Sequence, residues 1–127
     1  MNKSSWMELI EINRKKCEDI VACSKKVRYA GCFNEYGRTI AGKIRPGIKP
    51  VFSPNVIREE FFVIASTMKS RQKISKGLGE LKYILINHKK INILLFSKNT
   101  ITFYITFDQK TPADSTLINK IREIITK

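Results

Sequence analysis

The sequence predicts a mixed α/β (α+β) domain in which helices flank a single five-stranded antiparallel sheet. Hydrophobic patterns typical of helices and strands follow one another in the order α-β-β-α-β-β-β-α. Several neighbouring strands are separated by only a few residues, which favours antiparallel pairing because parallel strands need long crossover connections. A chain of 127 residues suits one hydrophobic core. We therefore expect residues 1–127 to form one domain.

The composition is that of an ordinary globular protein. Hydrophobic residues make up 43% of the chain and charged residues 28%, which excludes a disordered or fibrous class. The longest nearly apolar run, residues 91–96, is far shorter than the ~20 residues that a membrane-spanning helix needs. The N-terminus carries no apolar stretch typical of a secretory signal. We expect a cytoplasmic protein with no membrane partner.

A first helix is expected between Ser5 and about Ser24. Ser5 and Glu8 have the spacing of a capping box, in which the serine caps a backbone amide and the glutamate reaches back. Apolar residues then recur at helical intervals between basic ones, which predicts an amphipathic helix.

A hairpin is expected next. The alternation of Val27, Tyr29, Gly31 and Phe33 with intervening residues predicts a strand with one apolar face, and residues 34–37 supply turn chemistry. Residues 38–44 form the returning strand. The proline-rich and glycine-rich stretch that follows, residues 45–50, interrupts the sheet because proline cannot donate a ladder hydrogen bond.

The second helix is expected to start after Ser53, which is a typical N-cap, with Pro54 in the first helical position. It should run to about Lys76, where Gly77 and Gly79 end it. Three strands follow over residues 81–87, 91–97 and 101–107, and Asp114 or Ser115 caps a last helix. The expected core includes Phe33, Phe61, Ile64, Leu85, Leu94, Phe103, Ile105 and Ile121.

No motif for phosphate, nucleotide or metal chemistry occurs in the chain. Cys17, Cys23 and Cys32 lack the spacing of a zinc site, and the single histidine, His88, lies far away in the turn of an expected hairpin. Free cysteines are usually buried, so we interpret these three as core residues. We expect no catalytic centre, no metal and no cofactor.

The chain is strongly basic, with 24 lysines and arginines against 11 acidic residues and a net charge of +13. Such a charge is compatible with an anionic partner, although solvated lysines spread over every face are the simpler interpretation. The candidate anion-binding residues are Arg45, Lys69, Arg71, Lys73 and Lys76. A protein that binds nucleic acid or an anionic surface is thus one alternative, but the strands lack the aromatic and glycine pattern of common RNA-binding domains.

The order of elements and one passage, VRYAGCFNEYGRTIAGKIRPGI over residues 27–48, carry a resemblance to known proteins. From Cys17 onward the chain resembles the roadblock (dynein light chain) group within the profilin-like folds. The passage itself resembles the first hairpin of an uncharacterised archaeal family with that fold. In it, Gly31, Gly37 and Gly42 serve close packing and the turn.

The resemblance implies a non-catalytic regulatory module. Roadblock-like domains form dimers through the second helix and an edge strand, and many are platforms for small GTPases. Carried over to this chain, the edge strand is residues 81–87 and the interface helix residues 53–76. The candidate dimer interface comprises Phe62, Ile64, Met68, Leu81, Tyr83, Ile84 and Leu85. A ligand-sensing domain of the PAS or profilin-like type, with a cavity between sheet and helix, is a further alternative.

Overall fold

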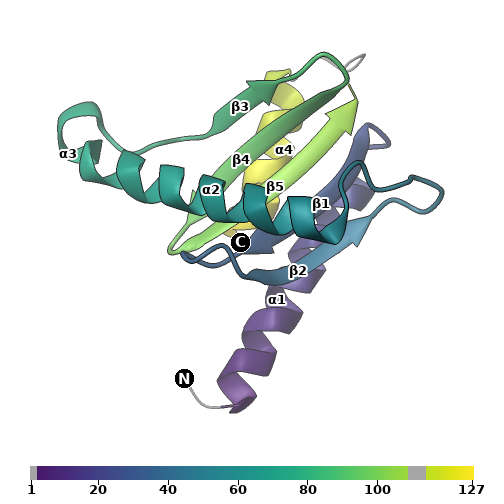
Figure 1. Ribbon diagram of the computed structural model, residues 1–127, viewed down its shortest axis with the longest axis horizontal. Coiled ribbons are helices and arrows are strands. Elements are labelled where there is room, and N and C mark those ends of the chain that lie inside the picture. The colour runs from purple at the N-terminus through teal and green to yellow at the C-terminus, as the bar shows by residue number, and fades with distance from the viewer. Residues whose placement is uncertain (1–2, 109–113) are drawn as a thin grey trace.

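The computed structural model describes residues 3–108 and 114–127 (Figure 1). The helices are α1 (Lys3–Cys23), α2 (Pro54–Lys73), α3 (Ser75–Leu78) and α4 (Ser115–Thr126). The strands are β1 (Val27–Phe33), β2 (Thr39–Ile44), β3 (Ile84–Asn87), β4 (Ile91–Lys98) and β5 (Ile101–Asp108). The predicted order of helices and strands is confirmed, with the short helix α3 as an addition. No helix in the described ranges is long and apolar enough to cross a membrane.

The strands form one five-stranded sheet in the order β2-β1-β5-β4-β3, and every neighbouring pair is antiparallel. The predicted single antiparallel sheet is therefore confirmed. Three of the pairs are hairpins between strands that follow one another along the chain. The fourth pair, β1 with β5, joins two distant segments at the middle of the sheet.

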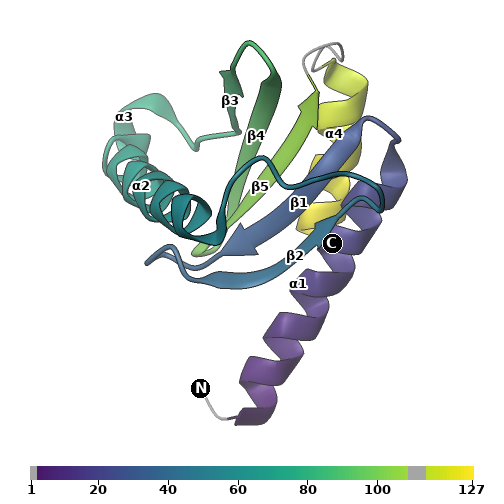
Figure 2. The same ribbon diagram turned by 45° about the vertical axis from the view of Figure 1, so that its right-hand side comes forward.

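Helices cover both faces of the sheet (Figures 1 and 2). Helices α1 and α4 lie on one face, where Cys17, Ile20, Phe103, Ile105 and Ile121 belong to one buried cluster. Helix α2 crosses the other face, where Phe33, Phe61, Ile64, Met68 and Tyr104 form a second cluster. Because both faces are covered, β4 and β5 are buried along nearly their whole length.

The predicted core is confirmed at every position except Leu85. The other residues expected there are at most 4% exposed, whereas the side chain of Leu85 is 39% exposed. Ile84 and Ile86 pack against the cluster under α2, so the alternation of a strand turns Leu85 to the opposite face. The prediction for Leu85 was wrong because β3 is a short edge strand, which the helices of that face do not cover completely.

Several predicted boundaries differ from the structure. Helix α1 already includes Lys3, so Ser5 lies inside the helix and does not cap it. Helix α2 starts as predicted, with the Ser53 side chain accepting a hydrogen bond from the Val56 amide, but it ends at Lys73. The chain leaves the helix at Ile74, which has φ of −101° and ψ of 2°. Strand β3 begins only at Ile84.

A β-bulge in β1 explains why the predicted apolar face of that strand was wrong. The register of β1 against β5 shifts between Val27 and Tyr29, which puts these two residues on opposite faces of the sheet. Val27, Ala30 and Cys32 pack under α1 and α4, whereas Tyr29 lies on the α2 side. Side chains on both faces of β1 therefore pack into the core clusters.

The turn between β1 and β2 touches α2 through Gly37. Its φ is +82°, and a Cβ atom added there would lie 2.7 Å from the backbone Cα of Phe62. Gly47 has a similar φ of +85° but no atom within 4 Å of the corresponding position. The close approach at Gly37 therefore fixes the distance between this turn and α2.

Replacing Gly37 with alanine is expected to destabilise the protein more than the matched replacement of Gly47. Gly47→Ala should cost roughly 1–2 kcal/mol, because only the left-handed backbone conformation opposes the side chain. Gly37→Ala should cost about 1–3 kcal/mol more, because backbone atoms of α2 must also move. Urea denaturation of both variants measures the difference. Equal losses would contradict the proposed contact.

Candidate functional site

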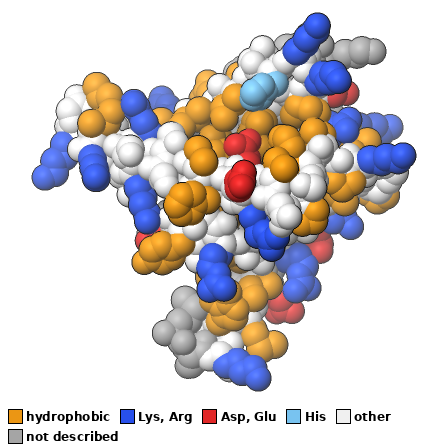
Figure 3. Space-filling view, viewed as in Figure 1, with side chains coloured by type: hydrophobic (Ala, Val, Ile, Leu, Met, Phe, Trp, Pro, Cys, Tyr) orange, Lys and Arg blue, Asp and Glu red, His pale blue; other side chains and the backbone are white. Residues whose placement is uncertain are grey.

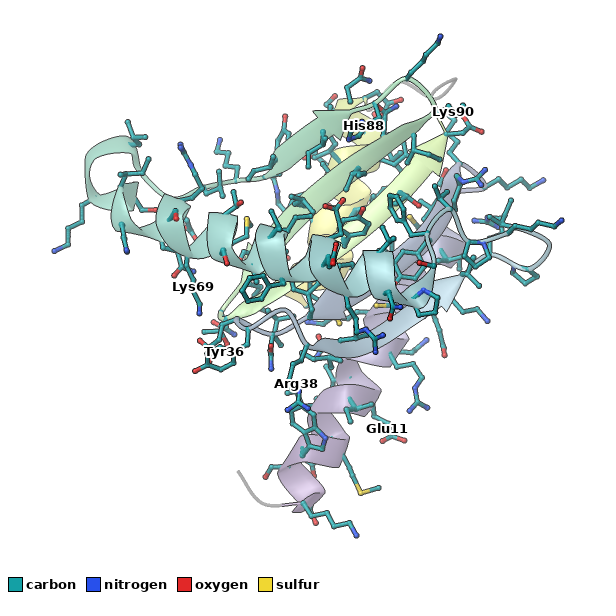
Figure 4. The ribbon with its side chains drawn as sticks, in the orientation of Figure 1. Glu11, Tyr36, Arg38, Lys69, His88 and Lys90 are labelled. Atoms are coloured by element: carbon teal, nitrogen blue, oxygen red, sulfur yellow. The ribbon has the colours of Figure 1, made fainter. Side chains whose placement is uncertain are left out.

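The outer side of α2 carries several exposed apolar residues. Phe61, Ile64 and Met68 face the sheet, and Val56, Phe62 and Val63 are 46%, 62% and 58% exposed. Residues seven apart lie on nearly the same side of a helix, so Phe62 and Lys69 share one flank. The Lys69 ammonium lies 4.6 Å from the ring centroid of Tyr36, in the β1–β2 turn (Figure 4). The flank with Phe62 therefore faces that turn, and Val63 faces outward.

The free edge of β3 is the second exposed apolar feature. In the described part of the chain, β3 pairs with β4 alone. Tyr83 and Leu85 are 38% and 39% exposed, and the Tyr83 ring lies 6.0 Å from that of Phe96. Lys82 is the only charged residue in the segment 81–87. Such an edge offers unpaired backbone groups to another strand. We call Tyr83, Ile84 and Leu85 together the β3 edge.

The residues predicted for the dimer interface do not form one patch. Ile64 and Met68 are 4% and 5% exposed and belong to the core of their own chain, so they are not available to a second copy. Leu81 is half-buried and packs against the same core cluster. Phe62 lies on the flank of α2 that faces the β1–β2 turn. The β3 edge and Phe62 remain as the accessible part of the predicted interface, and they lie on different parts of the surface.

Arg45 is not available as an anion-binding residue. Its Nε donates to the Val27 carbonyl at 2.7 Å, and its Nη2 donates to the carbonyls of Val21 at 2.5 Å and Ser24 at 2.6 Å. Carbonyls at the C-terminal end of a helix lack intrahelical donors, and the Arg45 guanidinium provides N–H donors for them. Arg45 therefore joins the C-terminal end of α1 to β1 and β2. Its predicted role in binding an anion is corrected to a structural one.

The other predicted anion-binding residues do not converge either. Lys69, Arg71 and Lys73 are exposed near the end of α2, and Lys76 is exposed in α3. Residues two apart on a helix point about 160° apart, so Arg71 faces away from Lys69 and Lys73. Figure 3 shows lysines and arginines spread around the visible face, with no single basic patch. These four residues therefore form no cluster that would select one anion.

The cysteines and the histidine are far apart in the fold. Cys17 and Cys32 are fully buried between α1 and β1, and all three cysteines are free thiols. A hydrogen bond with Cys32 and burial raise the pKa of the Cys17 thiol, which therefore stays protonated. His88 lies exposed in the β3–β4 turn, near Lys90 (Figure 4). Within residues 3–108 and 114–127, no group of three metal-binding side chains occurs.

A pocket of about 460 Å³ lies between the sheet and the chain that leads into α2. Tyr29, Gly42, Ile44, Tyr104 and Thr106 line it from the sheet. The remaining lining residues are Arg28, Ile48, Lys49, Pro50, Val51, Phe52, Pro54 and Ile57. We call this the loop pocket. Sequence reasoning missed it, although apolar residues at 48, 51 and 52 in a segment that belongs to no helix or strand were a signal.

The Tyr104 hydroxyl, next to the loop pocket, donates a hydrogen bond to Oε2 of Glu60 on α2 at 2.9 Å. Burial and the nearby Glu60 carboxylate raise the pKa of this hydroxyl. Burial also raises the pKa of Tyr29 to about 12. Both phenols therefore stay neutral at physiological pH.

No family model and no curated protein matches the chain. Among solved structures, a roadblock/LC7 domain from Streptomyces avermitilis is similar, with a TM-score of 0.69, 6% identity, and coverage of 89% of this chain and 91% of that one. This chain has a roadblock/LC7-like fold. MglB with tetrameric arrangement matches with a TM-score of 0.67 at 16% identity, over 99% of this chain and 85% of that one. Profilin IB from Acanthamoeba castellanii matches with a TM-score of 0.58 at 11% identity, over 90% and 94%.

These identities establish the fold alone. The predicted roadblock and profilin-like architecture is confirmed, and the architecture is shared by proteins of different kinds. Because no family model matches, the narrower resemblance to an archaeal family stays a prediction.

Proposed function

We propose that this chain is a non-catalytic interaction module that forms a two-fold dimer and serves as a platform for a small GTPase or another signalling protein. The free apolar edge of β3 is the observation that supports the dimer. A soluble protein usually covers, charges or pairs such an edge. The segment 81–87 carries Lys82 as its only charge, and Tyr83 and Leu85 are more than a third exposed. Pairing with a second copy would satisfy its backbone groups.

In the proposed dimer, β3 of one chain pairs antiparallel with β3 of the other, so that the two sheets become continuous. A two-fold axis places the same residues against each other, and like charges near the axis repel. The axis should therefore pass near Leu85, away from the basic end of α2. A stable interface needs about 1,200–2,000 Å² of buried surface in total, so Val63 and neighbouring residues of α2 should contribute as well.

The similar structure of MglB in a tetrameric arrangement supports self-association of this fold. The small GTPase as partner follows from the resemblance to roadblock domains, and the cytoplasmic location remains a prediction from the sequence. A dimer with a continuous sheet would present two copies of α2 on one face, which makes a broad platform for one partner.

Replacing Leu85 with lysine is expected to convert the dimer to a monomer. The two lysines would meet close to the axis, and like charges across an interface cost several kcal/mol, which corresponds to a dissociation constant weakened at least about 30-fold. Light scattering over a concentration series measures the mass. Ile12→Lys is the matched control, because Ile12 is exposed on α1, away from β3. A wild-type monomer at micromolar concentration would refute the dimer.

The wild-type protein and the Leu85→Lys variant also test whether the dimer is the platform. Immobilised wild-type protein should retain a GTP-binding protein from native extract in the presence of a non-hydrolysable GTP analogue, and release it when GDP replaces the analogue. Leu85→Lys should retain less of it if the dimer is the platform. Equal retention with the GTP analogue and with GDP would contradict a GTPase partner.

A further inference from the structure

We infer that the loop pocket binds an anionic amphiphile, an apolar chain that ends in a carboxylate, with the carboxylate held by Arg28 and Lys49. The pocket lies over β2, β1 and β5, whereas the proposed dimer uses β3 at the other edge of the sheet. The inference is therefore independent of the proposed dimer.

The walls of the loop pocket suit an apolar chain. Ile44, Tyr29 and the ring of Tyr104 line it from the sheet, and Ile48, Val51 and Phe52 line it from the connecting segment. Water is held poorly in a cavity with few polar partners, so apolar atoms are the favoured occupants. Val51 and Phe52 are still 57% and 37% exposed. A bound chain would cover this apolar surface.

The floor of the pocket is shaped by two facing glycines. Gly31 and Gly42 pair across β1 and β2, and a Cβ on Gly31 would lie only 2.0 Å from the Tyr29 hydroxyl oxygen. The Tyr29 side chain therefore extends across the sheet over these glycines instead of pointing up into the pocket. The space above it remains open beneath the segment 48–52.

The charges of the pocket select an anion. Arg28 and Lys49 are its only charged lining residues, and no carboxylate lines it. Within the described residues, the Arg28 guanidinium makes no ion pair, because Lys15 and Asp19 form the one salt bridge found there. The guanidinium fork matches a carboxylate with two parallel hydrogen bonds. The Tyr104 hydroxyl is already bonded to Glu60, so it does not compete for the head group.

The volume limits the length of the chain. At 460 Å³ the pocket lies within the range of about 300–1,000 Å³ that is typical of small-ligand sites. If each carbon and each carboxylate oxygen needs about 30 Å³, the space of a water molecule, a carboxylate of about thirteen carbons fills the pocket. Longer chains would extend into solvent.

Calorimetric titration with octanoate, decanoate and dodecanoate, below their micellar concentrations, tests the inference. Burial of each methylene should tighten binding about fourfold, so the dissociation constant should fall about 15-fold per two carbons until the pocket is full. Dodecanol should bind about tenfold more weakly than dodecanoate, because it lacks the charge. Equal affinities for octanoate and dodecanoate, or for dodecanol and dodecanoate, would overturn it.

Variants locate the binding. Arg28→Gln should weaken the binding of dodecanoate about tenfold and leave the binding of dodecanol unchanged. Arg38→Gln in the exposed β1–β2 turn is the control.

Val51→Asp tests the apolar wall of the pocket. It alters an exposed residue, so the fold should persist, and its carboxylate should repel the ligand; Leu78→Asp is the matched control. Leu85→Lys should bind dodecanoate as the wild type does. If Arg28→Gln and Val51→Asp both bind normally, the amphiphile binds elsewhere and the inference is wrong.

Discussion

Replacing Phe61 with alanine is expected to lower the free energy of unfolding by about 3–5 kcal/mol. Phe61 is 1% exposed and belongs to the buried cluster between α2 and the sheet. Its ring stacks on Phe33, with centroids 4.4 Å apart, and meets Tyr104 edge-on at 5.1 Å. Truncation would leave a cavity between the two layers and remove both aromatic contacts. Urea denaturation monitored by circular dichroism measures the loss.

The neighbouring residue provides a matched control. Phe62 has the same side chain but is 62% exposed, so Phe62→Ala should change the free energy of unfolding by no more than about 0.5 kcal/mol. Similar losses in the two variants would mean that α2 does not pack on the sheet through Phe61.

Replacing Arg45 with methionine should cost about 2–4 kcal/mol, because three carbonyls lose their donor while the apolar length of the side chain is kept. The affected acceptors are the carbonyls of Val21, Ser24 and Val27. Arg45→Lys should recover only part of the loss, since an ammonium lacks the planar fork of a guanidinium. Thermal and urea unfolding measure both variants.

Arg38→Met is the control for this prediction, because Arg38 is exposed and, among the described residues, only its backbone has a hydrogen bond. It should change the free energy of unfolding by less than about 0.5 kcal/mol. If Arg45→Met were equally mild, water would have to satisfy the three carbonyls as well as the arginine does.

Local patterns were sufficient to predict the architecture. Ser53 and Pro54 predicted the start of α2 correctly, and the short connections at 88–90 and 98–100 predicted antiparallel neighbours. These signals depend on residues that are close together in sequence. The roadblock-like fold followed from the resulting order of elements.

The errors concern features that depend on the assembled fold. A bulge changes which residues of a strand face the core, and no residue type marks the one in β1. Arg45 belonged to a basic stretch, and its three acceptors come together only when α1, β1 and β2 are in place. Leu85 is an apolar residue in an apolar segment, so burial was predicted. The exposure of its side chain follows from its position on the edge strand β3. The loop pocket likewise forms between segments that are distant in sequence.

The pairing of β1 with β5 in the middle of the sheet has a consequence for how the chain folds. The first hairpin is synthesised early, but its partner β5 lies near the other end of the chain. Until β5 leaves the ribosome, β1 has an open edge, and the apolar faces of the hairpin lack most of their cover. Contacts between such distant segments slow folding, and unpaired edges favour aggregation. A chain that stops before β5 should therefore depend on chaperones and should not accumulate as a native-like fragment.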